Sequence, residues 1–435
     1  MIVQRINISL GLVCILLMPA MAQGPLTIDD AVKRAVSRNL TIQAARERVD
    51  QARAGIGIAR SGRLPSLDLQ AQYNRIPGSG TFEIPSLAPG VPPQTVSISP
   101  TENTVATIQA RQAVYTGGMV SARISQASAL YDVALGTLAA TEAQTALQTR
   151  ASYYNALLAR SLIASQEQNL AAAKQHLGVA QDKFDVGTAA QFDVLRAQTT
   201  VSEAEQSLEE ARNQARSAIL NLNRLIASPI AADQQLVQPP MLPFPSDDVD
   251  ALVKKALDQR GEVLAARAQF AAQEAGIEVA RSERRPQIAL TAGYRQVSKE
   301  SPVLSSGLTF SATASLPLYD GARISSNVSQ AKSARDEARS NLEEMLLEVE
   351  QDVRQQHLDL QTARLTITTA ETRLAQAQEA YGISTVRYEA GVGTAVEVAD
   401  ALATLAAART NLDQARFNYN IAYSRLQRAL GLVTF

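Results

Sequence analysis

Two carboxylates in the C-terminal part of the chain are spaced so that together they could attract or repel ions. Glu397 and Asp400 are three positions apart, so both side chains would lie on one side of a helix. In three copies of the chain around a common axis they would form two rings of like charge, which favour cations and raise the barrier to anions. The alternative is a pair of ordinary exposed carboxylates near a helix N-terminus, where the helix dipole favours negative charge.

Residues that could catalyse a reaction do not form a recognisable pattern. His176 and His357 lie inside predicted long helices without metal-ligand spacing, and the sequence has neither a nucleophile motif nor a phosphate-binding glycine loop. Cys14 is the only cysteine and falls in a predicted leader, so the mature chain would have no thiol. The sequence therefore predicts a protein that is not an enzyme and has no cofactor and no metal site.

The composition favours long, closely packed helices over a large globular core. Aromatic residues make up 4% of the 435 residues, Trp is absent, and Ala and Gln are abundant. The formal net charge of −1 leaves no electrostatic footprint for a nucleic acid partner.

Residues 1–22 have the pattern of a secretory signal peptide. Arg5 gives a positive start, Leu10 to Met18 form a short apolar run, and Ala20-Met21-Ala22 is a small-x-small cleavage site. No later stretch has the length and apolarity of a membrane helix. A membrane-inserted part of the mature chain would therefore consist of β-strands.

An internal repeat sets the predicted architecture. Residues 28–75 align without gaps onto 249–296, and later segments match as well; the matching pairs include Ala54-Gly55-Ile56 with Ala275-Gly276-Ile277, Pro65 with Pro286, Tyr115 with Tyr319, and Gly187 with Gly391. The mature chain, 23–435, is predicted to be a single protomer with two repeats. Repeat one covers 25–227, a proline-rich linker covers 228–246, and repeat two covers 247–432.

Each repeat contains a predicted β-hairpin, at about 65–115 and 286–319. Apolar and polar residues alternate in four runs of nearly the length that a tilted membrane strand needs, as in Leu67, Leu69, Ala71 and Tyr73. Periodicity alone fits a half-buried sheet in a soluble protein equally well, but the leader and the duplicated setting favour the membrane. Four strands are too few to close a barrel, and three copies would supply twelve. The stretch Pro77–Pro100 is predicted to be a loop.

Long helical hairpins follow each β-hairpin, at about 119–227 and 322–430. Both stretches are rich in Ala, Gln and Glu, and their first arms would each run roughly 100 Å. Turns are predicted at Gly187 and around Gly391–Thr394. Each repeat is thus a helix, a β-hairpin and a long helical hairpin.

The chain resembles the TolC-like outer membrane factor family, also called the outer membrane efflux protein family, over essentially the whole mature sequence. The resemblance rests on the duplicated segment before each hairpin, on Leu316–Gly321, and on Tyr388–Thr394 leading to Glu397 and Asp400. It implies a mainly α fold with a transmembrane β-barrel, as a homotrimer with a 12-stranded barrel and an α-helical periplasmic tunnel. It also implies an outer-membrane location, contact with outer-membrane lipid, and a periplasmic adaptor and an inner-membrane transporter as partners for efflux or type I secretion.

The resemblance also assigns roles to residues. Glu397 and Asp400 would ring the closed end of the tunnel. The equivalent depth of Asp193 and Tyr388 on the two hairpins suggests a hydrogen bond that holds the tip closed. The chain departs from the family pattern at Gly393, where a basic residue is frequent. The expected adaptor-docking tips are Gly187, Thr188, Gly391, Val392, Gly393 and Thr394.

Tyr115 and Tyr319 are predicted to end the second strand of each repeat, either as membrane-interface aromatics or as packing at the junction with the helices. The competing class of protein is a soluble periplasmic coiled-coil adaptor or scaffold. It would account for the leader and the helices but not for the four amphipathic strands.

Overall fold

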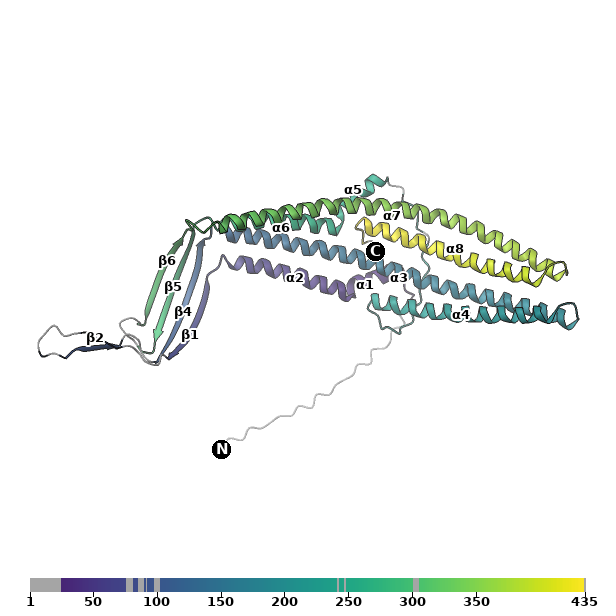
Figure 1. Cartoon of the computed structure of the whole chain (residues 1–435), viewed down its shortest axis with the longest axis horizontal. Helices are drawn as coiled ribbons and strands as arrows, with labels where there is room; N and C mark the ends of the chain where they lie inside the picture. The colour runs from purple at the N-terminus through teal and green to yellow at the C-terminus, as the bar shows by residue number, and fades with distance from the viewer. Residues whose placement is uncertain are drawn as a thin grey trace, which may run out of the picture.

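The computed structural model describes residues 25–75, 81–84, 90, 92–97, 102–240, 242–245, 248–299 and 305–433. The predicted signal peptide and Cys14 lie outside these residues. Figure 1 shows an elongated molecule with a β-sheet at one end and two helical hairpins at the other.

Apart from the short strands β2 and β3, the described residues run through the same order of elements twice. The first half contains α1 (Ile28–Arg38), α2 (Leu40–Ser61), β1 (Ser66–Arg75), β2 (Thr81–Ile84), β3 (Gln94–Ser97), β4 (Glu102–Tyr115), α3 (Met119–Asp185) and α4 (Gln191–Leu225). The second half contains α5 (Val249–Gln259), α6 (Gly261–Ser282), β5 (Gln287–Val297), β6 (Gly307–Ser315), α7 (Arg323–Glu389) and α8 (Ala395–Ala429). Corresponding helices have equal lengths of 11, 22, 67 and 35 residues.

The helix before each sheet segment is broken, where the sequence predicted one continuous helix. In the first half the break falls at Asn39, whose backbone has a ψ of 130°. The Asn39 side chain accepts a hydrogen bond from the Thr41 N–H and donates one to the Leu225 carbonyl at 3.0 Å. Asn39 therefore caps α2 and ties it to the end of α4. Arg260 takes the corresponding place between α5 and α6.

The long helices lie side by side toward the end of the molecule away from the sheet. Figure 1 shows α7, α8, α3 and α4 in this order, and α3 contacts both α4 and α8. At 67 residues, α3 and α7 are each about 100 Å long. None of the described helices combines the length and the apolarity that crossing a membrane demands.

The four main strands form one antiparallel sheet in the order β1-β4-β5-β6. Residues directly opposite each other share a face of the sheet. One row across all four strands is apolar, with Leu69, Ile108, Tyr294 and Leu308. A row on the other face is polar, with Ser66, Arg111, Thr291 and Ser311. The alternation read from the sequence therefore gives one apolar face and one polar face, with β1 and β6 at the edges.

Two details of the sheet region differ from the sequence-based expectation. The stretch predicted to be a loop contains the short antiparallel pair β2–β3. Strand β6 ends at Ser315, so Tyr319 does not end a strand and is 92% exposed, whereas Tyr115 does end β4. Pro317 explains the early end, because proline has no N–H to continue the ladder.

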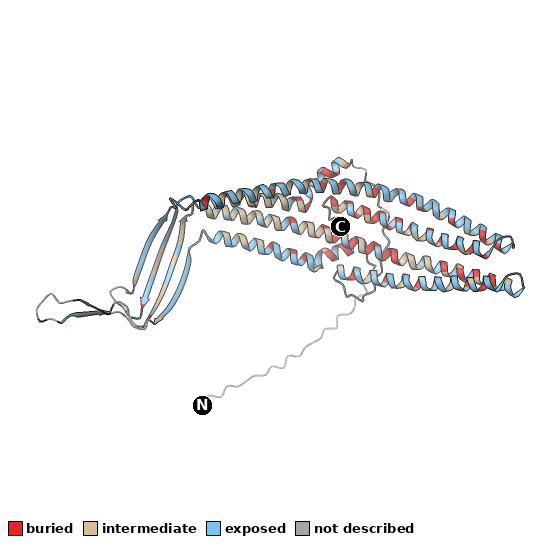
Figure 2. Ribbon diagram, in the orientation of Figure 1, coloured by how far each residue is buried: buried red, intermediate tan, exposed pale blue. Residues whose placement is uncertain are grey.

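Buried residues concentrate at mid-length, where the short helices cover the long ones (Figure 2). One cluster joins α1, α3, the end of α4 and α8, and another joins α5, α7 and α8. The Tyr153 hydroxyl donates to the Leu26 carbonyl at 2.7 Å and accepts from the Val237 N–H at 3.0 Å. The segment before α1 and the linker are thereby fixed on α3, so the mid-region holds the two halves together.

Candidate functional site

The two helical hairpins end in turns of the same geometry. Gly187 and Gly391 both have a φ of +76°, which glycine adopts without steric cost. In the first turn the Lys183 carbonyl accepts the Thr188 N–H at 2.8 Å, and in the second the Arg387 carbonyl accepts the Val392 N–H at 3.0 Å. These bonds supply donors to carbonyl groups at the helix ends that would otherwise have no hydrogen-bond partner.

Gly393 packs closely on the end of α7. A Cβ at this position would lie 3.0 Å from the Tyr388 nitrogen and 3.0 Å from the Arg387 Cβ. A side chain here would therefore require the turn to shift.

Glu397 and Asp400 lie in the first two turns of α8, and both are exposed in the single chain. Thr394 caps this helix by accepting the Glu397 N–H at 3.3 Å. The Glu397 carboxylate lies 3.9 Å from Arg387 Nε, and both side chains are about half exposed. An exposed ion pair of this kind contributes little to stability, so Glu397 stays available to ions near the tip.

Tyr388, at the end of α7, is the most enclosed of the predicted site residues. It is 6% exposed and packs with Val179, Ala395 and Val398. On the α3 side, the His176 ring centre lies 5.4 Å from the Tyr388 ring centre. Lys183 Nζ lies 4.1 Å from the same ring centre and donates a hydrogen bond to the Tyr388 carbonyl. Tyr388 is thus a contact between the two hairpins close to their tips.

The predicted hydrogen bond between Tyr388 and Asp193 is not formed. The Tyr388 hydroxyl is buried and has no hydrogen-bond partner among the described residues. The contacts of the ring with His176 and Lys183 fix it in a position where the hydroxyl does not reach Asp193. Asp193 nevertheless lies close enough to act through its charge. Burial raises the pKa of the Tyr388 hydroxyl, and the Asp193 carboxylate raises it further.

The same carboxylate acts on His176. Burial lowers the pKa of the His176 imidazole, because the charged form loses its hydration, and Asp193 partly opposes this shift. His176 is 7% exposed. Sequence reasoning missed both His176 and Lys183 as tip residues. Their seven-residue spacing, which places them on one side of α3, was the available signal.

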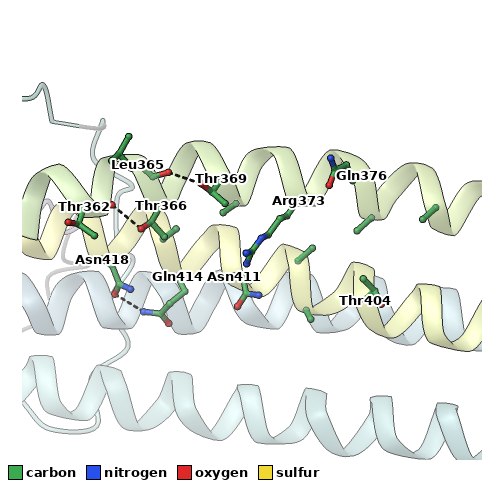
Figure 3. A pocket seen from close by; sticks show the side chains of 16 residues that line it. Thr362, Leu365, Thr366, Thr369, Arg373, Gln376, Thr404, Asn411, Gln414 and Asn418 are labelled. Atoms are coloured by element: carbon green, nitrogen blue, oxygen red, sulfur yellow. Dashed lines mark hydrogen bonds between the residues drawn. The ribbon is translucent and has the colours of Figure 1, made fainter.

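A groove of about 910 Å³ lies between α7 and α8 (Figure 3). Its α7 wall repeats at alternating spacings of four and three residues, as in a coiled coil: Thr362, Thr366, Thr369, Arg373, Gln376 and Ala380. The threonine hydroxyls bond to carbonyls of their own helix, as the Thr366 hydroxyl does to Thr362. The threonine and alanine side chains of this wall are small and leave space beside the helix seam.

Comparisons with known proteins agree on the class of this molecule. The sequence profile of the family described as "Outer membrane efflux protein" matches residues 31–228 and 252–432. The cobalt-zinc-cadmium resistance protein CzcC of Cupriavidus metallidurans is 25% identical over 398 residues, which cover 90% of this chain and 86% of CzcC. The outer membrane efflux protein BepC of Brucella suis is 25% identical over 419 residues, which cover 94% of this chain and 86% of BepC.

A crystal structure of a membrane protein from Pseudomonas aeruginosa has the same fold, with a TM-score of 0.79, 22% identity and 93% of each chain covered. The fold and the matched sequence define an outer-membrane channel of the kind that serves efflux or secretion systems. The chain belongs to the outer membrane efflux protein family. The predicted fold class, channel function and outer-membrane location are confirmed.

Proposed function

We propose that three copies of the chain assemble around one axis to form a channel. Their sheets close into a 12-stranded barrel, and their long helices continue it as a tunnel through the periplasm. The channel passes small molecules or proteins that an inner-membrane transporter and a periplasmic adaptor deliver.

The sheet carries this proposal. Its apolar face suits lipid and its polar face suits a water-filled interior, as the rows through Leu69 and Ser66 illustrate. The edge strands β1 and β6 would leave unpaired N–H and C=O groups in the hydrocarbon, at a cost of several kcal/mol for each group (order of magnitude). Pairing of β6 with β1 of the next copy removes both edges.

Glu397 and Asp400 form the constriction in this proposal. Both are exposed in the single chain and lie on one side of α8. In a trimer, three copies of each carboxylate would surround the axis, repel anions and lower the local concentration of anions. Asp182 and Asp185 provide a matched control, since they are also exposed, have the same spacing and end the other hairpin.

Single-channel conductance in planar bilayers tests the channel and its constriction together. Wild type should give small, cation-selective steps. Glu397→Ala/Asp400→Ala should enlarge the steps and reduce the selectivity, and Asp182→Ala/Asp185→Ala should change neither. Absence of conductance from folded protein would contradict the channel, and equal effects of both double variants would contradict the assignment of the constriction.

The hairpin tips are the proposed docking surface for the adaptor. Exposed apolar side chains gather at the turn residues 187–188 and 391–394 and next to them, among them Val186 (74%), Phe192 (64%) and Val392 (70%). Exposed apolar residues at one end of a molecule indicate a protein partner. Val186→Asp/Val392→Asp should keep its conductance yet fail to restore export in a deletion strain. Full restoration of export would contradict this surface.

Tyr115 and Tyr319 are proposed to mark the membrane interface next to the helices. Both are exposed, at 46% and 92%, at the junction of the sheet with α3 and α7. Because the chain has no Trp, Tyr319→Trp provides a single fluorescent probe of depth. Quenching by lipids brominated near the headgroup is expected, and quenching only by water-soluble reagents would contradict the proposal.

A further inference from the structure

The basic residues that end α3 and α7 occupy corresponding positions but have different contacts. Lys183 and Arg387 each precede the turn glycine by four residues. Arg387 stays within its own hairpin, facing Glu397 at 3.9 Å. Lys183 reaches across to the other hairpin, where it contacts both the ring and the carbonyl of Tyr388. The two-fold repeat of the sequence is therefore broken at this point.

The aromatic residues beside them differ in the same way. Phe184 and Tyr388 also correspond, but Phe184 is 39% exposed and Tyr388 is 6% exposed. Only Tyr388 lies in the seam between the hairpins, with His176 against its ring. The asymmetry thus involves a residue pair rather than a single side chain.

Two features of the end of α7 attract the Lys183 ammonium group. The last carbonyls of a helix carry the negative end of the helix dipole, and the Tyr388 carbonyl is among them. The face of an aromatic ring is also negative and binds a cation placed over it within about 6 Å. Nζ at 4.1 Å from the ring centre meets this condition while it donates to the carbonyl.

We propose that Lys183 is a positioning residue of the tip, which ties hairpin α3–α4 to hairpin α7–α8 by holding the end of α7 through the Tyr388 ring and carbonyl. In the channel proposed above, opening at the tip separates these hairpins and must break this tie. The inference rests on that proposed function for its role in gating, but the contact itself lies within one chain.

Hydrogen exchange measured by mass spectrometry on the full-length mature protein in detergent tests the tie without requiring conductance. In Lys183→Met, the amides of residues 383–393 should exchange about 2- to 30-fold faster than in wild type, the range that one cation–π contact supplies. Lys183→Arg keeps a cation and a donor and should restore slow exchange. Lys174→Met is the matched control, because Lys174 pairs with Glu205 within one hairpin at 3.2 Å.

Variants of Tyr388 separate the ring from the hydroxyl. Tyr388→Phe should leave exchange unchanged, because the hydroxyl has no described partner. Tyr388→Leu removes the ring and should raise exchange, and adding Lys183→Met to it should raise exchange by less than Lys183→Met does alone. Wild-type exchange in Lys183→Met, or strictly additive effects in the double variant, would overturn the tie. A wild-type protein that fails to conduct would overturn the proposed function. The exchange measurements would still test the contact between Lys183 and Tyr388.

Discussion

At the scale of single residues, His176 makes the tip sensitive to pH. Its pKa is lowered in the folded protein by burial, while the charge of Asp193 works in the opposite direction. The unfolded chain therefore binds the proton more readily than the folded tip does. The stability that the neutral imidazole contributes is fully present above pH 6.5, the ordinary value, and is lost as the pH falls through the lowered value.

We predict that acidification from pH 7 toward pH 5 lowers the protection against hydrogen exchange around residues 176 and 388 in wild type, measured relative to the intrinsic exchange rate at each pH, and lowers it less in His176→Gln. Asp193→Asn should lower the pKa of His176 further, because it removes the opposing charge. Since the chain has two histidines, an NMR titration in a His357→Gln background reports on His176 alone. A pKa of His176 that rises in Asp193→Asn would contradict this account.

At the scale of elements, a cluster of four charged residues joins α6, α7 and α8. Arg260, 6% exposed, pairs with Glu262 at 3.2 Å and with Asp352 at 2.9 Å. Arg428 pairs with the same two carboxylates, at 3.0 Å each. The corresponding positions of the first half carry Asn39, Thr41, Gln148 and Arg224. The second half thus fixes its helix break with charges, and the first half fixes it with an amide cap.

Arg428→Met should lower the free energy of unfolding by roughly 1–3 kcal/mol, less than for a fully buried ion pair because the carboxylates are partly exposed. Arg354→Met is the control on α7, because its partners Glu350 and Asp250 are exposed, and it should change the free energy of unfolding little. Chemical denaturation of both variants measures the difference. An equal loss in the two would show that the cluster adds no stability.

The sheet allows a test with neighbouring positions. Phe310 lies on the apolar face, in the same row as Leu67, and Thr309 lies on the polar face. If the apolar face meets lipid, Phe310→Arg should cost about 2–4 kcal/mol near the bilayer centre, whereas Thr309→Arg should be tolerated. Folding yield in lipid vesicles, followed by heat-dependent gel mobility, gives the comparison. Equal yields would contradict a lipid-facing Phe310.

The sequence predicted those elements that depend on residues close together in the chain. The alternation of apolar and polar residues predicted the four main strands. Pro317 would also have indicated that β6 ends before Tyr319. The break at Asn39 was missed because its stabilising partner, Leu225, is far along the chain. The Lys183–Tyr388 contact was missed for the same reason, and the expected Tyr388–Asp193 bond was wrong because packing around the ring decides where the hydroxyl lies. The spacing of residues within one helix indicates which of them share a face, but it does not identify their partner on a distant helix.

At the scale of the whole molecule, the internal repeat accounts for a four-stranded sheet with two open edges. A duplicated chain supplies two β-hairpins to one four-stranded sheet, and this sheet has edges at β1 and β6. The wall of α7, α8, α3 and α4 is likewise open on both sides (Figure 1). A rotational assembly closes the sheet and the helical wall together, because each copy offers the same two edges to its neighbours.

The most direct test of the account is the mass of the folded protein extracted from the outer membrane, measured by native mass spectrometry. The full chain has a mass of 46.6 kDa, and the account predicts a particle of three mature chains that dissociates when the sheet unfolds. A single folded chain as the dominant species, with its sheet intact in lipid or detergent, would contradict the shared barrel and the channel that depends on it.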